Sequence, residues 1–295
     1  MQYCLTTDID YPLSMAKISD EQNKLEDLRK ILENGSDDPD WNRSSFEEIE
    51  VVTFKGKIVI PPALQNGIIE WYHEVLRHPG KDRTYQSISH QFHWKNLRKS
   101  THNFVESCDL CNRLKRRTGS RYGHLPLKDT DDDCTPWKRV YIDSIGPWCC
   151  TDKNGIQHCL NALTVIDAAT GWFEVFRVNT ATAEEAARRF DHEWLARYRR
   201  PCQVICDLGG EFMGGFRELE ASYGFKLRPA GRRNPQANGL IERIHLVMQN
   251  MLLTYELGDR SWTGDENILW DEYLAAIAFA IRATHNTTLG ASPAE

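Results

Sequence analysis

The pattern of hydrophobic and polar positions divides the chain into two structured regions joined by a polar segment. Residues 51–60 alternate about Gly56, which predicts a hairpin, and helical periodicity follows over 63–76, 82–90 and 96–108. Residues 112–136 are basic and then polar, a composition typical of an interdomain linker. Beyond the linker, short apolar runs alternate with amphipathic stretches, which predicts a central sheet flanked by helices. The expected strands are 140–145, 159–167, 172–178, 203–207 and 225–228, and the expected helices are 182–198, 214–223, 238–256 and 269–284.

Charge is distributed unevenly along the chain, although the net charge is only −6. Residues 1–50 hold 13 acids and 5 bases, and apart from a short helical pattern over 19–32 they predict an acidic spacer or peripheral arm. Residues 51–124 hold 13 bases and 5 acids, whereas residues 125–295 hold 24 acids and 18 bases. A basic segment of this kind is typical of nucleic-acid binding.

Composition excludes several classes of protein. Hydrophobic residues make up 41% and charged residues 26%, which is ordinary for a globular protein. No apolar run is long enough to cross a membrane, and the first residues lack the pattern of a secretory signal. The nine cysteines are therefore expected to be thiols or metal ligands rather than disulfides.

Two histidines and two cysteines have the spacing of a structural zinc site. His73 and His78 stand at the end of the first expected helix, and Cys108 and Cys111 form a C-x-x-C pair after the third. Structural zinc takes four nitrogen and sulfur ligands in a tetrahedron, and such a site supplies much of the folding free energy of a small module. A redox role for the cysteine pair is a weaker alternative because no thioredoxin-like strand and helix surround it. Rival ligands are His90, His93 and His102.

Three acidic residues stand out by their positions in the expected strands and helices. Asp143 lies inside an apolar strand, Asp207 ends another, and Glu242 lies near the start of a long helix. On that helix, Glu242, His245 and Gln249 share a polar face opposite the apolar stripe. Carboxylates that converge at a sheet edge bind divalent ions for phosphoryl transfer, although surface acids are the commoner explanation for any one of them.

The combined order of these motifs resembles the integrases of retroviruses and LTR retrotransposons, most closely the gypsy type. H-x4-H is followed by C-x2-C and then by two aspartates and a glutamate. The local strings agree: V-Y-I-D and I-G-P around Asp143, D-x-G-x-E-F from Asp207, and N-P-Q-x-N-G-x-x-E-R ending at Arg243. H-N at 285–286 and S-P at 292–293 resemble the end of that family's core, so the resemblance covers about residues 55–295.

The resemblance implies an α/β fold: an RNase H-like core with a five-stranded mixed sheet, preceded by a small helical zinc-binding domain. The implied domains are a spacer (1–50), a hairpin and zinc domain (51–118), a linker (119–136) and a catalytic core (137–295). Implied zinc ligands are His73, His78, Cys108 and Cys111, and implied catalytic ligands for two Mg²⁺ or Mn²⁺ ions are Asp143, Asp207 and Glu242.

The implied activity is DNA integration, in which the enzyme trims the 3′ ends of element DNA and joins them to target DNA. The implied partners are element and target DNA and further copies of the chain, with no membrane. The implied location is the nucleus after a cytoplasmic particle stage, without secretion.

Other basic and amide residues are candidate DNA contacts. Gln236, Asn238 and Arg243 adjoin the glutamate motif, although the first two also suit a simple turn and the arginine a solvated surface. A basic run beside the cysteine pair suits the phosphate backbone or, alternatively, a nuclear-import signal; it comprises Arg113, Lys115, Arg116, Arg117 and Arg121.

The sequence also departs from the family pattern. Only 34 residues separate Asp207 from Glu242, and the basic C-terminal tail of the family is absent from the printed sequence. We expect a polyprotein fragment, or a truncated or host-retained copy. The alternative functions are an integrase-derived DNA-binding protein without joining activity and a nuclease of the same sheet class.

Overall fold

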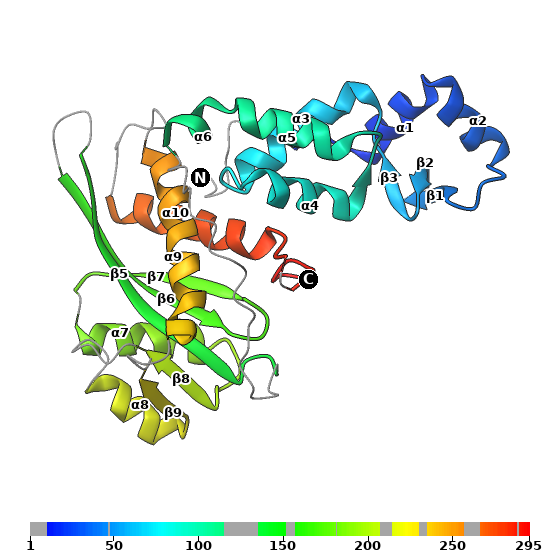
Figure 1. Ribbon diagram of the computed structural model, residues 1–295. Coiled ribbons are helices and arrows are strands. Elements are labelled where there is room, and N and C mark those ends of the chain that lie inside the picture. The colour runs from blue at the N-terminus through cyan, green and yellow to red at the C-terminus, as the bar shows by residue number, and fades with distance from the viewer. Residues whose placement is uncertain are drawn as a thin grey trace. The chain divides into compact units, whose positions relative to one another are not determined.

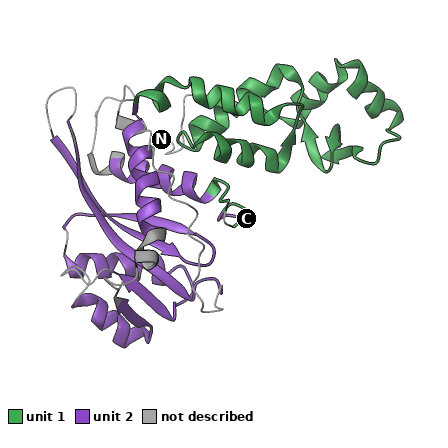
Figure 2. Ribbon diagram, in the orientation of Figure 1, with its two compact units in different colours: residues 1–113, 283–292 green, residues 114–282, 293–295 purple. Residues whose placement is uncertain are grey.

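The structure is a computed structural model in which two compact units are described separately (Figure 2). Unit 1 comprises Met1–Arg113 and Ala283–Ser292, and unit 2 comprises Leu114–Arg282 and Pro293–Glu295. The described residues are 11–46, 48–114, 135–151, 157–180, 182–206, 214–229, 235–256, 266–287 and 289–295.

Unit 1 combines a small sheet with helices (Figure 1). Its four strands pair in the order β1-β2-β3-β4, antiparallel except for β3 and β4. The expected hairpin corresponds to β2 and β3, and the three expected helices correspond to α3, α4 and α5. The elements are α1 (Met15–Asn23), α2 (Glu26–Asn34), β1 (Trp41–Phe46), β2 (Ile49–Phe54), β3 (Lys57–Val59), α3 (Pro62–Val75), α4 (Lys81–Gln91), β4 (Phe92–His93), α5 (Leu97–Ser107) and α6 (Asp109–Leu114).

The described part of the expected spacer is folded into unit 1. Gln22 on α1 is fully buried, where its side-chain amide donates to the carbonyls of Val52 and Val59 and its Oε1 accepts from Val52 N. Ile18 on the same helix joins the apolar core. Acidic composition conceals this packing because only one face of each short helix is apolar, and residues 11–46 therefore belong to the folded unit rather than to a separate arm.

Unit 2 is built on a five-stranded mixed sheet in the order β7-β6-β5-β8-β9. β5, β6 and β7 pair antiparallel, whereas β8 and β9 run parallel to β5, so the RNase H-like arrangement is confirmed. The elements are β5 (Arg139–Thr151), β6 (Gln157–Asp167), β7 (Phe173–Val178), α7 (Ala183–Arg189), a π-helical turn η1 (Phe190–Leu195), β8 (Gln203–Cys206), α8 (Gly215–Tyr223), β9 (Lys226–Pro229), α9 (Pro235–Glu256) and α10 (Glu266–Ala283).

Helices cover both faces of this sheet. Because side chains alternate along a strand, Val140 and Ile142 of β5 pack with α7, η1 and α8, while Tyr141 and Ile145 pack with α9 and α10. Thr182 caps the start of α7, because its hydroxyl accepts from Glu185 N. None of the described helices is long and apolar enough to span a membrane.

An irregularity in β5 explains the I-G-P string. The register between β5 and β6 shifts between Ile145 and Trp148. Gly146 there has φ +119°, and a Cβ atom on it would lie 2.4 Å from the carbonyl oxygen of Leu160. Only glycine satisfies both conditions, because other residues are strained at this φ and the neighbouring atom is backbone.

The expectation that disulfides are absent is wrong at one pair. Cys149 on β5 and Cys159 on β6 are joined by a disulfide. These residues lie directly opposite each other in the antiparallel ladder, which brings their side chains together. Composition alone cannot reveal a pairing that depends on strand register.

Candidate metal centre and catalytic face

A tight turn after α3 brings His73 and His78 together. His78 N donates to the carbonyl of His73 (2.7 Å), and Arg77 between them adopts φ +57°, as in a Schellman motif with arginine where glycine is usual. His78 also has φ +57°. The turn places the two imidazole rings edge to face, with centroids 4.6 Å apart.

The cysteine pair lies at the junction of two helices. Cys108 ends α5 in an extended conformation, and its carbonyl accepts from Asn112 N in the first turn of α6. Cys111 therefore lies one helical turn beyond Cys108, so both sulfur atoms project from the same junction.

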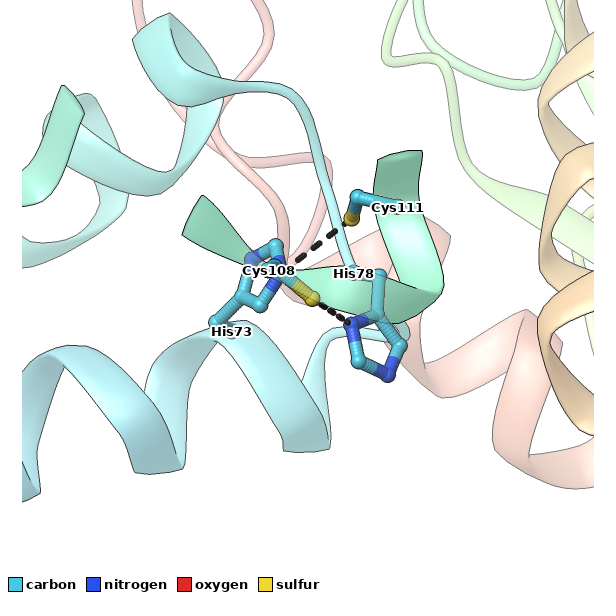
Figure 3. A group of neighbouring side chains, drawn as sticks. All are labelled: His73, His78, Cys108 and Cys111. Carbon is cyan, nitrogen blue, oxygen red and sulfur yellow. Dashed lines mark hydrogen bonds between the residues drawn. The ribbon is translucent and has the colours of Figure 1, made fainter. Parts of the chain in front are cut away.

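The four side chains form one cluster (Figure 3). One ligand atom from each lies within 4.8 Å of the others, and the cluster is largely buried. Cys108 Sγ is 3.6 Å from His78 Nδ1, and Cys111 Sγ is 3.3 Å from His73 Nε2. Tetrahedral zinc with ordinary Zn–S and Zn–N bonds sets sulfur and nitrogen about 3.6 Å apart. The donor set and its spacing therefore fit a structural zinc ion.

Neighbouring side chains orient the histidine rings. His78 Nε2, which faces away from Cys108, lies 3.6 Å from Glu74 Oε2, and Phe104 packs edge-on against His73. Burial raises the pKa of the Glu74 carboxyl, and the adjacent Glu70 carboxylate adds to this rise. A carboxylate beside the non-ligating nitrogen is a common arrangement for metal-bound histidine, because it fixes the tautomer of the ring.

The rival histidines have other neighbours. The ring of His93 stacks on Phe54, and His102 Nε2 lies 3.2 Å from Asp82 Oδ1. Within the described residues, the only group of metal-ligating side chains that converges is the predicted one.

Asp143 lies on the central strand of unit 2, on the face covered by α9. Its Oδ1 accepts from Ser144 N (2.9 Å), and its Oδ2 lies 3.7 Å from His245 Nδ1 on α9. Thr164, opposite Asp143 in β6, donates to the Asp143 carbonyl (2.9 Å) and lies 2.8 Å from His245 Nε2. The carboxylate remains about one-third exposed and so is accessible to a ligand.

His245 is more enclosed than the helical pattern indicated. Its side chain is 13% exposed and packs towards the sheet, not on a polar face directed away from it. Burial lowers the pKa of His245 to about 4, so the ring is neutral at neutral pH. This contact between the strand and the helix was missed from the sequence, although the i, i+3 spacing from Glu242 was visible.

The other two predicted acids are placed by their elements. Glu242 is exposed on α9, one turn before His245. Asp207 lies outside the described residues, but it follows Cys206, which pairs with Ile142, the residue before Asp143.

The predicted DNA contacts are only partly described. Arg243 is exposed on α9, and Arg113 forms an exposed ion pair with Asp109. The side chains of Gln236 and Asn238 lie outside the described part of α9. Four residues of the basic run also lie outside the described residues of the chain: Lys115, Arg116, Arg117 and Arg121.

Comparison with known proteins agrees with this arrangement. The family model described as the integrase zinc-binding domain matches residues 60–117, which contain all four clustered ligands. The Transposon Tf2-3 and Tf2-4 polyproteins of Schizosaccharomyces pombe are each 26% identical to the chain over 242 residues. The chain is similar to these transposon polyproteins, and its residues 60–117 match the integrase zinc-binding domain.

The match to each polyprotein covers 79% of this chain but 18% of the polyprotein. The chain therefore spans a small part of the length of these relatives. A chain of the simian T-cell lymphotropic virus intasome, solved in complex with PP2A regulatory subunit B56 gamma, has a TM-score of 0.50 and 16% sequence identity. The match covers 77% of the chain described here and 70% of the intasome chain, which supports the fold.

Proposed function

We propose that this chain is the zinc-binding and catalytic part of a retroelement integrase, which trims the 3′ ends of element DNA and joins them to target DNA. The observation that carries the proposal is the position of Asp143. It lies about one-third exposed at the centre of the sheet, under the helix that bears Glu242 and beside the strand that leads into Asp207.

The described carboxylates suit divalent ions. Asp143 and Glu242 offer accessible oxygen ligands, the donors that Mg²⁺ and Mn²⁺ prefer. Two such ions, held by these residues and Asp207, would activate the attacking oxygen and stabilise the leaving oxygen of a phosphoryl transfer.

The protein residues in this scheme supply position and charge. Ser144 N binds one oxygen of the Asp143 carboxylate, and His245, neutral because it is buried, contacts β5 and β6 from α9. Exposed Arg243 adjoins Glu242 and is suited to a phosphate of the bound strand. The reaction needs no covalent intermediate on the protein.

The zinc cluster has a different role in the proposal. His73, His78, Cys108 and Cys111 join the end of α3 to the junction of α5 and α6, so zinc would stabilise unit 1 without taking part in the chemistry.

The test is a joining assay on short duplexes that carry the element's own ends, with Mg²⁺ or Mn²⁺. We expect Glu242→Gln and Asp143→Asn to abolish the joined product, whereas Glu218→Gln, an exposed acid at the start of α8, retains it. Cut but unjoined products from the wild type would favour the nuclease alternative. DNA binding with neither product would favour an integrase-derived binding protein.

A further inference from the structure

Unit 1 contains a pocket that shares no residue with the zinc cluster. It has a volume of about 270 Å³ and lies between β3, α4, β4 and the start of α5. Its lining combines cations with aromatic rings and includes Lys57, Tyr85, Phe92, His93, Trp94 and Arg98.

The pocket carries positive charge without an acidic side chain in its lining. Lys57 Nζ donates to the carbonyl of Ser89 (2.5 Å) and has no carboxylate partner among the described residues. Arg98 forms an ion pair with Asp82, but both side chains are more than half exposed, so water weakens the pair. Burial lowers the pKa of His93, and the charges of Lys57 and Lys55 lower it further, as expected where the local potential is positive.

The first turn of α5 adds to this potential. Asn96 precedes the helix with φ +68°, and its side chain makes no capping hydrogen bond, whereas Ser14 caps α1 and Thr182 caps α7. The first turn contains no acidic residue but includes Arg98 and Lys99. Cations at the positive end of a helix dipole are unfavourable, so a bound anion would stabilise this turn.

The pocket walls provide flat apolar surface and a buried donor. Arg98 lies over the ring of Tyr85, 5.8 Å from its centroid, and the ring of His93 stacks on Phe54 outside the pocket. Trp94 is 4% exposed, and its Nε1 has no hydrogen-bond acceptor within the described residues. Cations interleaved with aromatic rings are the chemistry that proteins use to bind unpaired bases and their phosphates.

We propose that this pocket binds one unpaired nucleotide of a DNA strand, with its phosphate near Lys57, Arg98 and the start of α5 and its base against the aromatic wall. The inference rests on the proposed function, which supplies DNA as the partner. The volume is slightly below the usual range for ligand pockets, about 300–1,000 Å³, and so suits a single nucleotide rather than a base pair. An acidic peptide would satisfy the cations but leave the rings without a stacking partner.

The test compares the affinity of the zinc-loaded full chain for two labelled duplexes, one blunt and one with a short single-stranded overhang, by fluorescence anisotropy. We expect the wild type to prefer the overhang. Lys57→Gln and Arg98→Gln should each reduce this preference about 5- to 10-fold, the size expected for one lost stacked and phosphate-bound nucleotide. Lys30→Gln is the matched control, since it removes the same charge from an exposed residue of α2 that does not line the pocket. It should leave the preference unchanged.

A second variant separates stacking from charge. Tyr85→Leu should reduce the preference for the overhang while leaving the salt dependence of binding unchanged, because it removes a ring and no cation. The inference is overturned if the Lys57, Arg98 and Tyr85 variants retain zinc and the wild-type preference. It is also overturned if the substitutions weaken the binding of a glutamate-rich peptide and leave the affinity for the overhang duplex unchanged.

The two proposals fail separately. Glu242→Gln should abolish joining and keep the overhang preference, because Glu242 does not line the pocket. If the pocket proposal is wrong, joining still depends on Glu242.

Discussion

A buried ion pair in unit 2 gives the sharpest stability prediction. Arg282 Nη1 on α10 lies 2.7 Å from Glu174 Oε1 on β7, and the two side chains are 22% and 10% exposed. The same carboxylate accepts from Tyr198 OH (2.5 Å) and Trp172 Nε1 (3.3 Å). Arg282→Met removes the only cation among these three partners of Glu174 and leaves a buried carboxylate without charge compensation.

The expected cost follows from what remains around Glu174. Removing one partner of a buried pair typically costs about 3–5 kcal/mol. The hydroxyl of Tyr198 and the indole of Trp172 still donate, so we expect about 2–3 kcal/mol for Arg282→Met, at or just below the lower limit of that range. Adding Glu174→Gln neutralises the stranded charge, and the double variant should therefore be less destabilised than the sum of the two single variants by about 1–2 kcal/mol.

The assay is urea unfolding of the four proteins of this cycle, followed by circular dichroism and tryptophan fluorescence. Arg188→Met is the control, because Arg188 is 51% exposed and pairs with Glu185 on the same helix, where about 0.3–0.5 kcal/mol is expected. The reasoning is refuted if Arg282→Met costs no more than Arg188→Met, or if the cycle shows no coupling between the two sites.

Three further predictions concern other parts of the chain. Gly146→Ala should destabilise unit 2 by about 2 kcal/mol or more in urea unfolding, since it combines φ strain with a backbone clash, whereas Gly67→Ala inside α3 should be neutral or stabilising. Cys108→Ser should reduce bound zinc below one ion per chain by atomic absorption and lower the unfolding midpoint of unit 1, while exposed Cys202→Ser retains full zinc. The folded pKa of His245, about 4, lies below its unfolded value of about 6.5, so its stabilisation is present above pH 6.5 and is lost as the pH falls towards 4. In metal-free protein, His245→Asn should abolish this acid-dependent loss, which amounts to about 3 kcal/mol in the free energy of unfolding. An unchanged pH profile of stability would contradict the assigned burial of His245.

Periodicity predicted those elements whose buried face is set locally. The strands of unit 2 and helices α3, α4 and α5 were all anticipated, because their apolar spacing follows one period throughout. The acidic first region was not, since its folding depends on Gln22 reaching the backbone of β2 and β3, a contact between residues about 30 apart.

The same distinction applies to the site. The zinc ligands were predicted because short spacing between each pair is a local signal, and the structure brings the two pairs together. The disulfide and the contact between Asp143 and His245 were missed, because both depend on which strand or helix lies opposite. Strand register and helix docking arise from the whole core, and a sequence pattern contains them only indirectly.

The most direct test of the proposed activity is the amount of joined DNA formed by the wild type and by Glu242→Gln on the same duplex with Mg²⁺. The account predicts joined product from the wild type alone, with both proteins binding the duplex equally well. Equal product from the two proteins, or duplex binding by the zinc-loaded wild type without any joining, would contradict it.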